Sequence, residues 1–199
     1  ISDGMAKKGL IALAWYDSGA RSFYNSKKPI EKPEDVTGMK VRVMNNDLFV
    51  NMVGSMGGNA TPMAFSEVYS SIKTGVVDGA ENNWPSYEST GHYEVAGYYS
   101  STEHLIIPEC FCVSKAVWDG LSDEEKAVVK SAARDSAELQ RDLWAKRSDA
   151  SRDKVIAAGV KYNEIADKAP FQAAMKPVYD KFIADNPDLA DLVAAIQAV

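Results

Sequence analysis

The residue best suited to binding a small anion is Arg42, in the short apolar run KVRVM at positions 40–44. On a strand, alternation places the two valines on one face and the arginine on the other. A buried guanidinium needs an anionic partner, because an unpaired buried charge is strongly destabilising. That partner is either a carboxylate from a neighbouring strand, Asp78 or Glu81, or a ligand carboxylate, which arginine can hold with two parallel hydrogen bonds.

A polar cluster, DGAENN, occupies positions 78–83. Asn82 and Asn83 stand where a strand gives way to a helix, a place where asparagine commonly forms a turn or caps the helix. Alternatively, one of these amides reaches the same pocket as Arg42. Phe65, at the end of an intervening strand, is either a core residue or a wall of that pocket. The residues alone leave both pairs of alternatives open.

The sequence gives little support for a catalytic site. The two histidines, His92 and His104, are too few for most metal sites and have no nucleophile near them in the sequence. Glu67, Asp78 and Glu81 would have to form a carboxylate pair in order to hydrolyse a glycoside. The glycines of GSMGGNA follow a helix and lack the GK[ST] of a phosphate-binding loop. We therefore expect no catalytic residues, no metal and no cofactor.

The only cysteines are Cys110 and Cys112, in PECFCVS. On a strand they would point to the same face, where a disulfide between them would have distorted geometry. Nothing nearby supplies two further metal ligands at zinc-finger spacing. The residues favour two small buried side chains and leave the redox compartment undecided.

The elements that must position these residues alternate in period between Gly38 and Trp84. Strands are expected at 40–44, 60–65 and 76–81, and helices at 46–56 and 66–73. This order is typical of a parallel sheet covered by helices. Such a sheet builds anion sites where its strands end.

Longer elements surround this unit. Strands are expected at 10–16, at 102–114 across Pro108, and at 160–165. A capping box, Ser122 to Glu125, opens a helical pattern that runs to Gly159, on the order of 55 Å at 1.5 Å per residue. A helix of this length could span two lobes.

Composition narrows the function. The 199 residues are 46% hydrophobic and 25% charged, which is ordinary for a soluble globular protein. The net charge of −6 argues against a nucleic-acid partner. No apolar run approaches the roughly 20 residues that cross a bilayer, so no membrane insertion is expected.

The runs GMKVRV and GGNATPMAFSEVYSSIKTGVVDGAENNWPSY resemble the DctP-like family, the extracytoplasmic solute-binding proteins of TRAP transporters. The resemblance continues through HYEVAGYYSSTEHLIIPE and the helix after LSDEEK, so it covers essentially the whole chain. It implies an α/β fold like that of periplasmic binding proteins, in which a βα lobe, crossover strands and one long helix span two lobes. It also implies that most of the first lobe is missing from this sequence.

The resemblance divides the chain into four parts. Residues 1–14 are a remnant of the first lobe and the start of the crossover, 15–103 the ligand-binding α/β second lobe, 104–159 a crossover strand and the long helix, and 160–199 a strand and helices returning to the second lobe.

The family's binding residues can be carried over one by one. The arginine that clamps the ligand carboxylate falls on Arg42, and the asparagine that hydrogen-bonds the ligand falls on Asn82. A second arginine falls on Arg21, and the aromatic that packs on the ligand falls on Phe65. Four further residues are expected near the ligand: His104, Trp84, Tyr87 and Glu81.

The implied function is a periplasmic receptor that captures a small organic acid by hinge closure and delivers it to TRAP transporter membrane subunits. The aromatic, amide-rich GAENNWPSY slightly favours a polyhydroxylated acid such as a hexuronate over a C4-dicarboxylate. Two rival hypotheses are a ligand sensor for a signalling protein and a carbohydrate-active enzyme.

Overall fold

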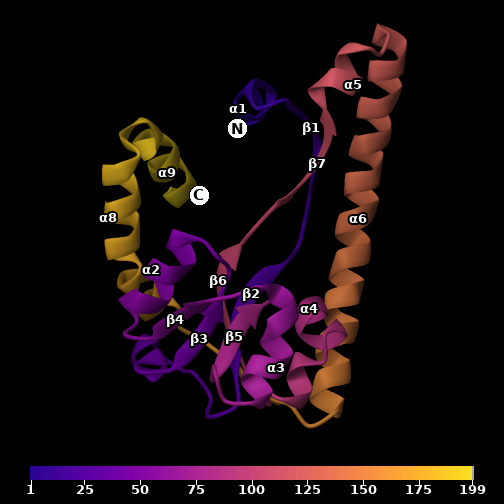
Figure 1. Cartoon of the computed structure of the whole chain (residues 1–199). Helices are drawn as coiled ribbons and strands as arrows, with labels where there is room; N and C mark the ends of the chain where they lie inside the picture. Colours follow the sequence, from indigo (N-terminus) through magenta and orange to yellow (C-terminus); the bar gives the residue numbers. More distant parts are fainter. Residues whose placement is uncertain (199) are drawn as a thin grey trace.

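A computed structural model of the chain describes residues 1–198 (Figure 1). Its centre is a six-stranded sheet with the order β4-β3-β5-β2-β6-β8. The strands are β2 (Ala20–Asn25), β3 (Lys40–Val43), β4 (Asn59–Pro62), β5 (Gly79–Asn82), β6 (Tyr98–Ile106) and β8 (Lys161–Glu164). A separate antiparallel ribbon, which we call the outer ribbon, pairs β1 (Leu10–Tyr16) with β7 (Glu109–Ser114).

The predicted strand–helix unit is present. β3 pairs in parallel with β4 and β5, and the connections contain α2 (Asp47–Ser55) and α3 (Val68–Lys73). The whole sheet is mixed, because β2 runs antiparallel to both β5 and β6. Two boundaries differ from those expected: β4 ends at Pro62, and β5 begins only at Gly79.

The sheet buries an apolar cluster on each face. On one face, Val41 and Val43 pack with α2, whose Phe49 and Val53 are buried. On the other, Tyr24 and the residues of α3 form a second cluster. Its buried members are Tyr24, Val68, Ile72, Val77, Ala80, Tyr87, Ala96, Tyr99, Val155 and Val160. The alternation of β3 therefore separates its valines from Arg42, as the sequence predicts.

A 35-residue helix, α6 (Asp123–Ala157), runs beside the sheet and on along the outer ribbon toward α5 (Lys115–Asp119) (Figure 1). Its capping box is confirmed, because Ser122 Oγ accepts from Glu125 N at 3.2 Å and Glu125 Oε2 accepts from Ser122 N at 2.8 Å. The remaining helices are α1 (Ser2–Lys7), α4 (Trp84–Ser89), α7 (Ala169–Ala174), α8 (Lys176–Asp185) and α9 (Ala190–Gln197), with short 3-10 turns at Pro33–Val36, Phe65–Glu67, His92–Glu94 and Pro187–Leu189.

The junction between β1 and β2 is held by α6. Asp17 N donates to Gln140 Oε1 at 2.9 Å, and Gln140 Nε2 donates to Asp17 O at 2.7 Å. Gly19 follows with φ +70°, and a Cβ there would lie 3.0 Å from Trp144 Nε1. The turn therefore requires glycine both for its backbone conformation and for its contact with the indole.

The strand expected at 102–114 is two strands. β6 ends at Ile106 and β7 begins at Glu109, and they belong to different sheets. Pro108 lies between them, where it has no N–H to donate to either ladder. Cys110 and Cys112 lie on β7 as free thiols, and in this chain they are half-exposed rather than buried. No helix within residues 1–198 is both long and apolar enough to cross a membrane.

Candidate ligand-binding site

Arg42 is 4% exposed and forms no ion pair with a carboxylate of residues 1–198. Its Nε and Nη2 donate to the backbone oxygen of Met63, at 3.1 Å and 2.8 Å. This contact fixes one edge of the guanidinium and leaves its Nη1–Nη2 edge without a partner among the described residues. Burial lowers the pKa of Arg42 from its ordinary value. The guanidinium of arginine nevertheless stays protonated in proteins, so Arg42 carries a positive charge.

The expected alternative, an ion pair from Arg42 to Asp78 or Glu81, is wrong. Asp78 immediately precedes β5, and its side chain accepts from Lys40 N at 2.8 Å. Glu81 pairs with Arg21 instead, with Nε to Oε2 at 2.6 Å and Nη2 to Oε1 at 2.7 Å. Glu81 is fully buried and Arg21 is 9% exposed, so this is a buried, two-point ion pair.

The pair has a clear electrostatic consequence for Glu81. Burial alone would raise the pKa of Glu81, but the hydrogen bonds from Arg21 outweigh it and hold that pKa below its usual 4.5. Both partners are therefore charged at neutral pH, and their charges cancel. Four of the five N–H donors of Arg21 are used within the protein, two on the Glu81 carboxylate, one on Glu81 O and one on Asn82.

The sequence left open whether Asn82 and Asn83 cap a helix or reach the ligand pocket, and the structure gives them different contacts. Asn83 caps α4, since its Oδ1 accepts from Ser86 N at 2.9 Å. Asn82 Oδ1 accepts from Arg21 Nη1 at 3.0 Å and from Asn83 N at 2.9 Å. Its carbonyl group is therefore fixed, while its Nδ2 makes no hydrogen bond within residues 1–198. Asn82 Nδ2 is therefore a hydrogen-bond donor held in place beside the Arg21–Glu81 ion pair.

Phe65 is not a core residue, because 42% of it is exposed. Its ring lies 5.6 Å from the guanidinium carbon of Arg42 and meets His92 edge-on at 5.5 Å. His92 is 1% exposed and shares a 2.8 Å hydrogen bond with Tyr24 OH. Sequence reasoning did not assign His92 to the site, because its neighbours in the chain gave no indication that it would lie behind Phe65.

His104 lies beside the Arg21–Glu81 pair. Its Nε2 is buried, has no hydrogen bond and lies 3.5 Å from Glu81 Oε2. Its Nδ1 is 2.8 Å from Thr102 Oγ1, and its ring stacks on Phe23 at 4.4 Å. The 3.5 Å separation is an ion-pair distance only when the imidazole is protonated, so Nε2 is otherwise an unsatisfied polar atom.

Trp84 and Tyr87 were expected near the ligand, but both belong to an apolar cluster. Tyr87 is fully buried, and its hydroxyl donates to Ala96 O at 2.5 Å. The prediction that Tyr87 contacts the ligand is therefore wrong. Tyr87 is a core residue, because neither its ring nor its hydroxyl is accessible to a ligand. Trp84 stacks on Tyr99 at 3.5 Å and belongs to the same apolar cluster, of which it forms the partly buried edge.

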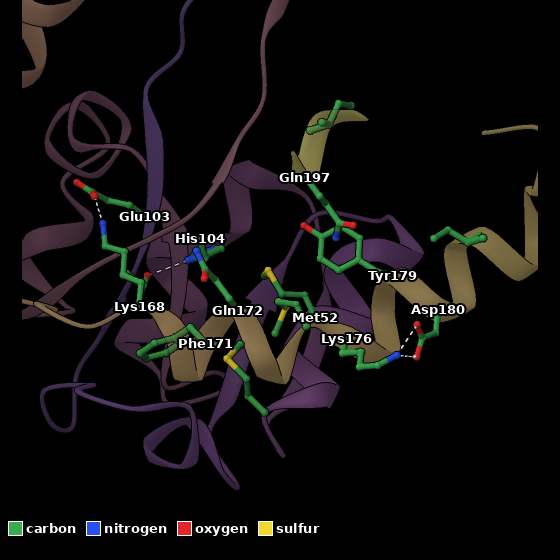
Figure 2. A pocket seen from close by; sticks show the side chains of 15 residues that line it. Met52, Glu103, His104, Lys168, Phe171, Gln172, Lys176, Tyr179, Asp180 and Gln197 are labelled. Atoms are coloured by element: carbon green, nitrogen blue, oxygen red, sulfur yellow. Dashed lines mark hydrogen bonds and ion pairs between the residues drawn. The ribbon is translucent and has the colours of Figure 1, made fainter. Parts of the chain in front are cut away.

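A pocket of about 670 Å³ lies next to His104, between β6, α7, α8 and α9 (Figure 2). Met52, Phe171 and Met175 form its apolar side, and the ion pairs Lys168–Glu103 and Lys176–Asp180 lie on its rim. Of the predicted site residues only His104 lines it. Arg42 on β3, Asn82 at the end of β5 and Phe65 in the 3-10 turn after β4 do not line it.

The carboxylates considered for catalysis are engaged separately. Glu67 Oε2 accepts from Ala64 N at 3.2 Å, Asp78 bonds to the backbone of Lys40, and Glu81 pairs with Arg21. They do not form the facing acid–base pair that glycoside hydrolysis needs. The structure instead places the exposed aromatic face of Phe65 beside the free edge of Arg42, a pairing whose guanidinium can bind an anion, while the amide of Asn82 is held by Arg21.

Comparison with known proteins decides the family. Residues 1–186 match the DctP family model, described as bacterial extracellular solute-binding protein, family 7. The chain belongs to this family. A curated member, a solute-binding protein of Chromohalobacter salexigens, is 59% identical over 98% of this chain and 58% of its own length.

Solved structures of this family share the fold throughout. A TRAP periplasmic solute-binding protein of Roseobacter denitrificans with bound β-D-glucuronate is 65% identical, with a TM-score of 0.96 over 100% of this chain and 66% of its own. One from Sulfitobacter with bound β-D-galacturonate is 64% identical, with a TM-score of 0.93 over 96% of this chain and 64% of its own. The chain thus spans between 58% and 66% of the length of these relatives.

Proposed function

We propose that this chain is the ligand-binding part of a TRAP-type periplasmic receptor for a hexuronate, which it binds through Arg42 and delivers to the transporter's membrane subunits. The observation that carries the proposal is the free Nη1–Nη2 edge of Arg42, in a family whose similar members hold glucuronate and galacturonate. Binding makes or breaks no bond, and the protein acts as a receptor rather than an enzyme.

The charge of the site supports a singly charged acid. Arg21 and Glu81 cancel, since +1 and −1 sum to zero. Burial, with Arg42 nearby, lowers the pKa of His92 to about 4, so His92 is neutral at physiological pH. Arg42 remains as one uncompensated positive charge. A hexuronate carries one carboxylate, whereas a C4-dicarboxylate would bring a second negative charge that these residues do not balance.

The arrangement of donors supports the same class. A guanidinium edge fits the two oxygens of one carboxylate with parallel hydrogen bonds. Asn82 Nδ2 can donate to a carboxylate or hydroxyl oxygen, and the exposed face of Phe65 can cover the apolar C–H face of a sugar ring. Because Met63 O and Asn82 Oδ1 already fix these groups, binding orders few additional side chains.

The experiment is a thermal-shift and calorimetric screen of the full-length protein with D-glucuronate, D-galacturonate, D-glucose and succinate. A ligand that binds only the folded state raises its melting temperature. We expect stabilisation by one or both uronates and none by glucose, which has the ring without the carboxylate. Stabilisation by succinate with no response to either uronate would overturn the choice of ligand, and equal binding of glucose would overturn the carboxylate clamp.

A further inference from the structure

Tyr24 and Arg42 lie on the same face of the sheet, one on each side of Ala80. Tyr24 is opposite Ala80 in the antiparallel pairing of β2 with β5. Val41 is level with Gly79 in the parallel pairing of β3 with β5, so Arg42 is also level with Ala80. Residues that are level on neighbouring strands point to the same face. The small side chain of Ala80 therefore separates the tyrosine from the arginine.

Two aromatic rings from outside the sheet connect this tyrosine to this arginine. His92 Nδ1 shares a 2.8 Å hydrogen bond with Tyr24 OH, and the His92 ring meets the ring of Phe65 edge-on at 5.5 Å. The Phe65 ring in turn lies 5.6 Å from the guanidinium carbon of Arg42. The contacts therefore run without interruption from a core tyrosine to the arginine that is proposed to bind the ligand.

Burial fixes Tyr24 and His92 but does not fix Phe65. Tyr24 and His92 are each 1% exposed, and Tyr24 also packs on Tyr87 at 4.7 Å. Phe65 is exposed and lies in a 3-10 turn rather than in a strand. An exposed side chain keeps rotamer freedom that burial would remove. The edge contact with the immobile His92 therefore limits the orientations that the Phe65 ring can take.

The imidazole of His92 suits this contact because it is neutral and anchored. Burial, with Arg42 nearby, lowers the pKa of His92 to about 4, so at neutral pH the ring adds no second positive charge beside the guanidinium. Aromatic pairs prefer edge-to-face arrangements, because the positive edge of one ring meets the negative face of the other. A neutral imidazole can make this contact with its ring while its Nδ1 stays bound to Tyr24.

We propose that His92 is a positioning residue for uronate binding. Anchored by Tyr24, it holds the Phe65 ring in the orientation that covers the sugar ring of the ligand. His92 does not itself touch the ligand, because it is buried behind Phe65. This inference rests on the proposed function, since it takes hexuronate binding by Arg42 and Phe65 as given. It adds that a residue inside the fold contributes to the affinity for the sugar ring.

The test is a double-mutant cycle in the full-length protein. Affinities for D-glucuronate and D-galacturonate are measured by calorimetry in the unmodified protein, His92→Gln, Phe65→Ala and the double variant. Glutamine at position 92 can still accept from the Tyr24 hydroxyl but has no ring. If His92→Gln does not fold, Tyr24→Phe takes its place in the cycle, because it removes only the hydroxyl that anchors His92.

Ser100→Ala is the matched control for a loss of stability alone. It removes a buried hydroxyl that accepts from Ile30 N at 2.9 Å. Ser100 is level with Phe23 of β2, and both Phe23 and Ile30 belong to the apolar cluster on the opposite face of the sheet from Tyr24. This variant should therefore have a lower melting temperature and an unchanged affinity for both uronates.

We expect His92→Gln to weaken binding of the preferred uronate by about two- to twelvefold, which corresponds to the usual strength of one aromatic pair. In the Phe65→Ala background the same change should have no further effect, because the ring through which His92 acts is gone. Unchanged affinity in His92→Gln, or an equal loss in both backgrounds, would overturn the positioning role and leave the proposed function intact. If the unmodified protein bound neither uronate, the proposed function would itself be wrong.

Discussion

Arg42 and Glu81 lie on neighbouring strands but on opposite faces of the sheet. Val41 is level with Gly79 in the parallel pairing of β3 with β5, so Arg42 is level with Ala80, and Val43 with Glu81. Glu81 therefore projects to the face where Arg21 lies, and Arg42 projects to the other. Because of this separation, Glu81 neutralises Arg21, whereas Arg42 has no carboxylate partner and can bind a ligand.

Replacement of Glu81 by Gln should destabilise the fold by about 3–5 kcal/mol, because it leaves Arg21 buried without its counter-ion. Urea denaturation at pH 7.5 measures the loss. Asp180→Asn is the control, since its ion pair with Lys176 is exposed and should leave the midpoint almost unchanged. Equal midpoints for the two variants would show that the Arg21–Glu81 pair is not a major source of stability.

Replacement of Arg42 by Ala should weaken uronate binding by about 2–5 kcal/mol, the range expected when one partner of a desolvated charge pair is removed. Arg42→Lys should also bind more weakly, because an ammonium cannot make the two-pronged contact. Calorimetry with the preferred uronate measures both. Arg152→Ala on the exposed side of α6 is the control and should bind as the unmodified protein does. Full affinity in Arg42→Lys would argue for a simple point-charge contact.

The buried His92 should make stability fall as the pH is lowered from 6.5 toward 4. Its folded pKa of about 4 lies below the ordinary 6.5, so in this window the unfolded chain binds a proton that the folded chain does not. The effect is negligible above about pH 7.5 and reaches about 3 kcal/mol near pH 4. Urea midpoints at pH 7.5, 6, 5 and 4.5 measure it. In His92→Gln the decline between pH 6.5 and 5 should be shallower, and an unchanged slope would contradict the assignment.

Local patterns were sufficient for much of the fold. The change from strand to helix period predicted α2, the capping box at Ser122 predicted the start of α6, and alternation in KVRVM correctly separated Arg42 from its valines. The pairing of Arg21 with Glu81 was not predictable, because it depends on β2 inserting antiparallel beside β5. Nothing local reports which strands become neighbours.

The candidate site, like the sheet, depends on contacts between distant parts of the chain that local sequence does not report. Arg42, Asn82 and Phe65 were selected by residue type and family resemblance. Arg42 and Asn82 lie on β3 and β5 as expected, whereas Phe65 lies in a 3-10 turn beyond the end of β4 rather than on the strand. Tyr87 was selected in the same way, yet it is fully buried. Its burial depends on packing of helix α4 against Tyr24 of β2 and Tyr99 of β6, contacts that bring together distant parts of the chain.

The amide of Gln140 should control the stiffness of the junction between the outer ribbon and the main sheet. It bonds both backbone polar groups of Asp17, the N–H at 2.9 Å and the C=O at 2.7 Å. Gln140→Ala leaves both groups unpaired, and Gln140→Glu, when ionised, can accept from the N–H but cannot donate to the C=O. The quantity compared is the protection factor, which is the slowing of amide hydrogen exchange relative to the intrinsic rate at the same pH. At residues 17–19 we expect it to be lowest in Gln140→Ala and intermediate in Gln140→Glu at pH 7.5. It should be higher in Gln140→Glu when the carboxylic acid is protonated, because the acid regains a donor. Leu143→Ala, on the exposed side of α6, is the control and should leave exchange there unchanged. If exchange at this junction were the same in all four proteins, the Gln140 bonds would not be what holds β1 to α6.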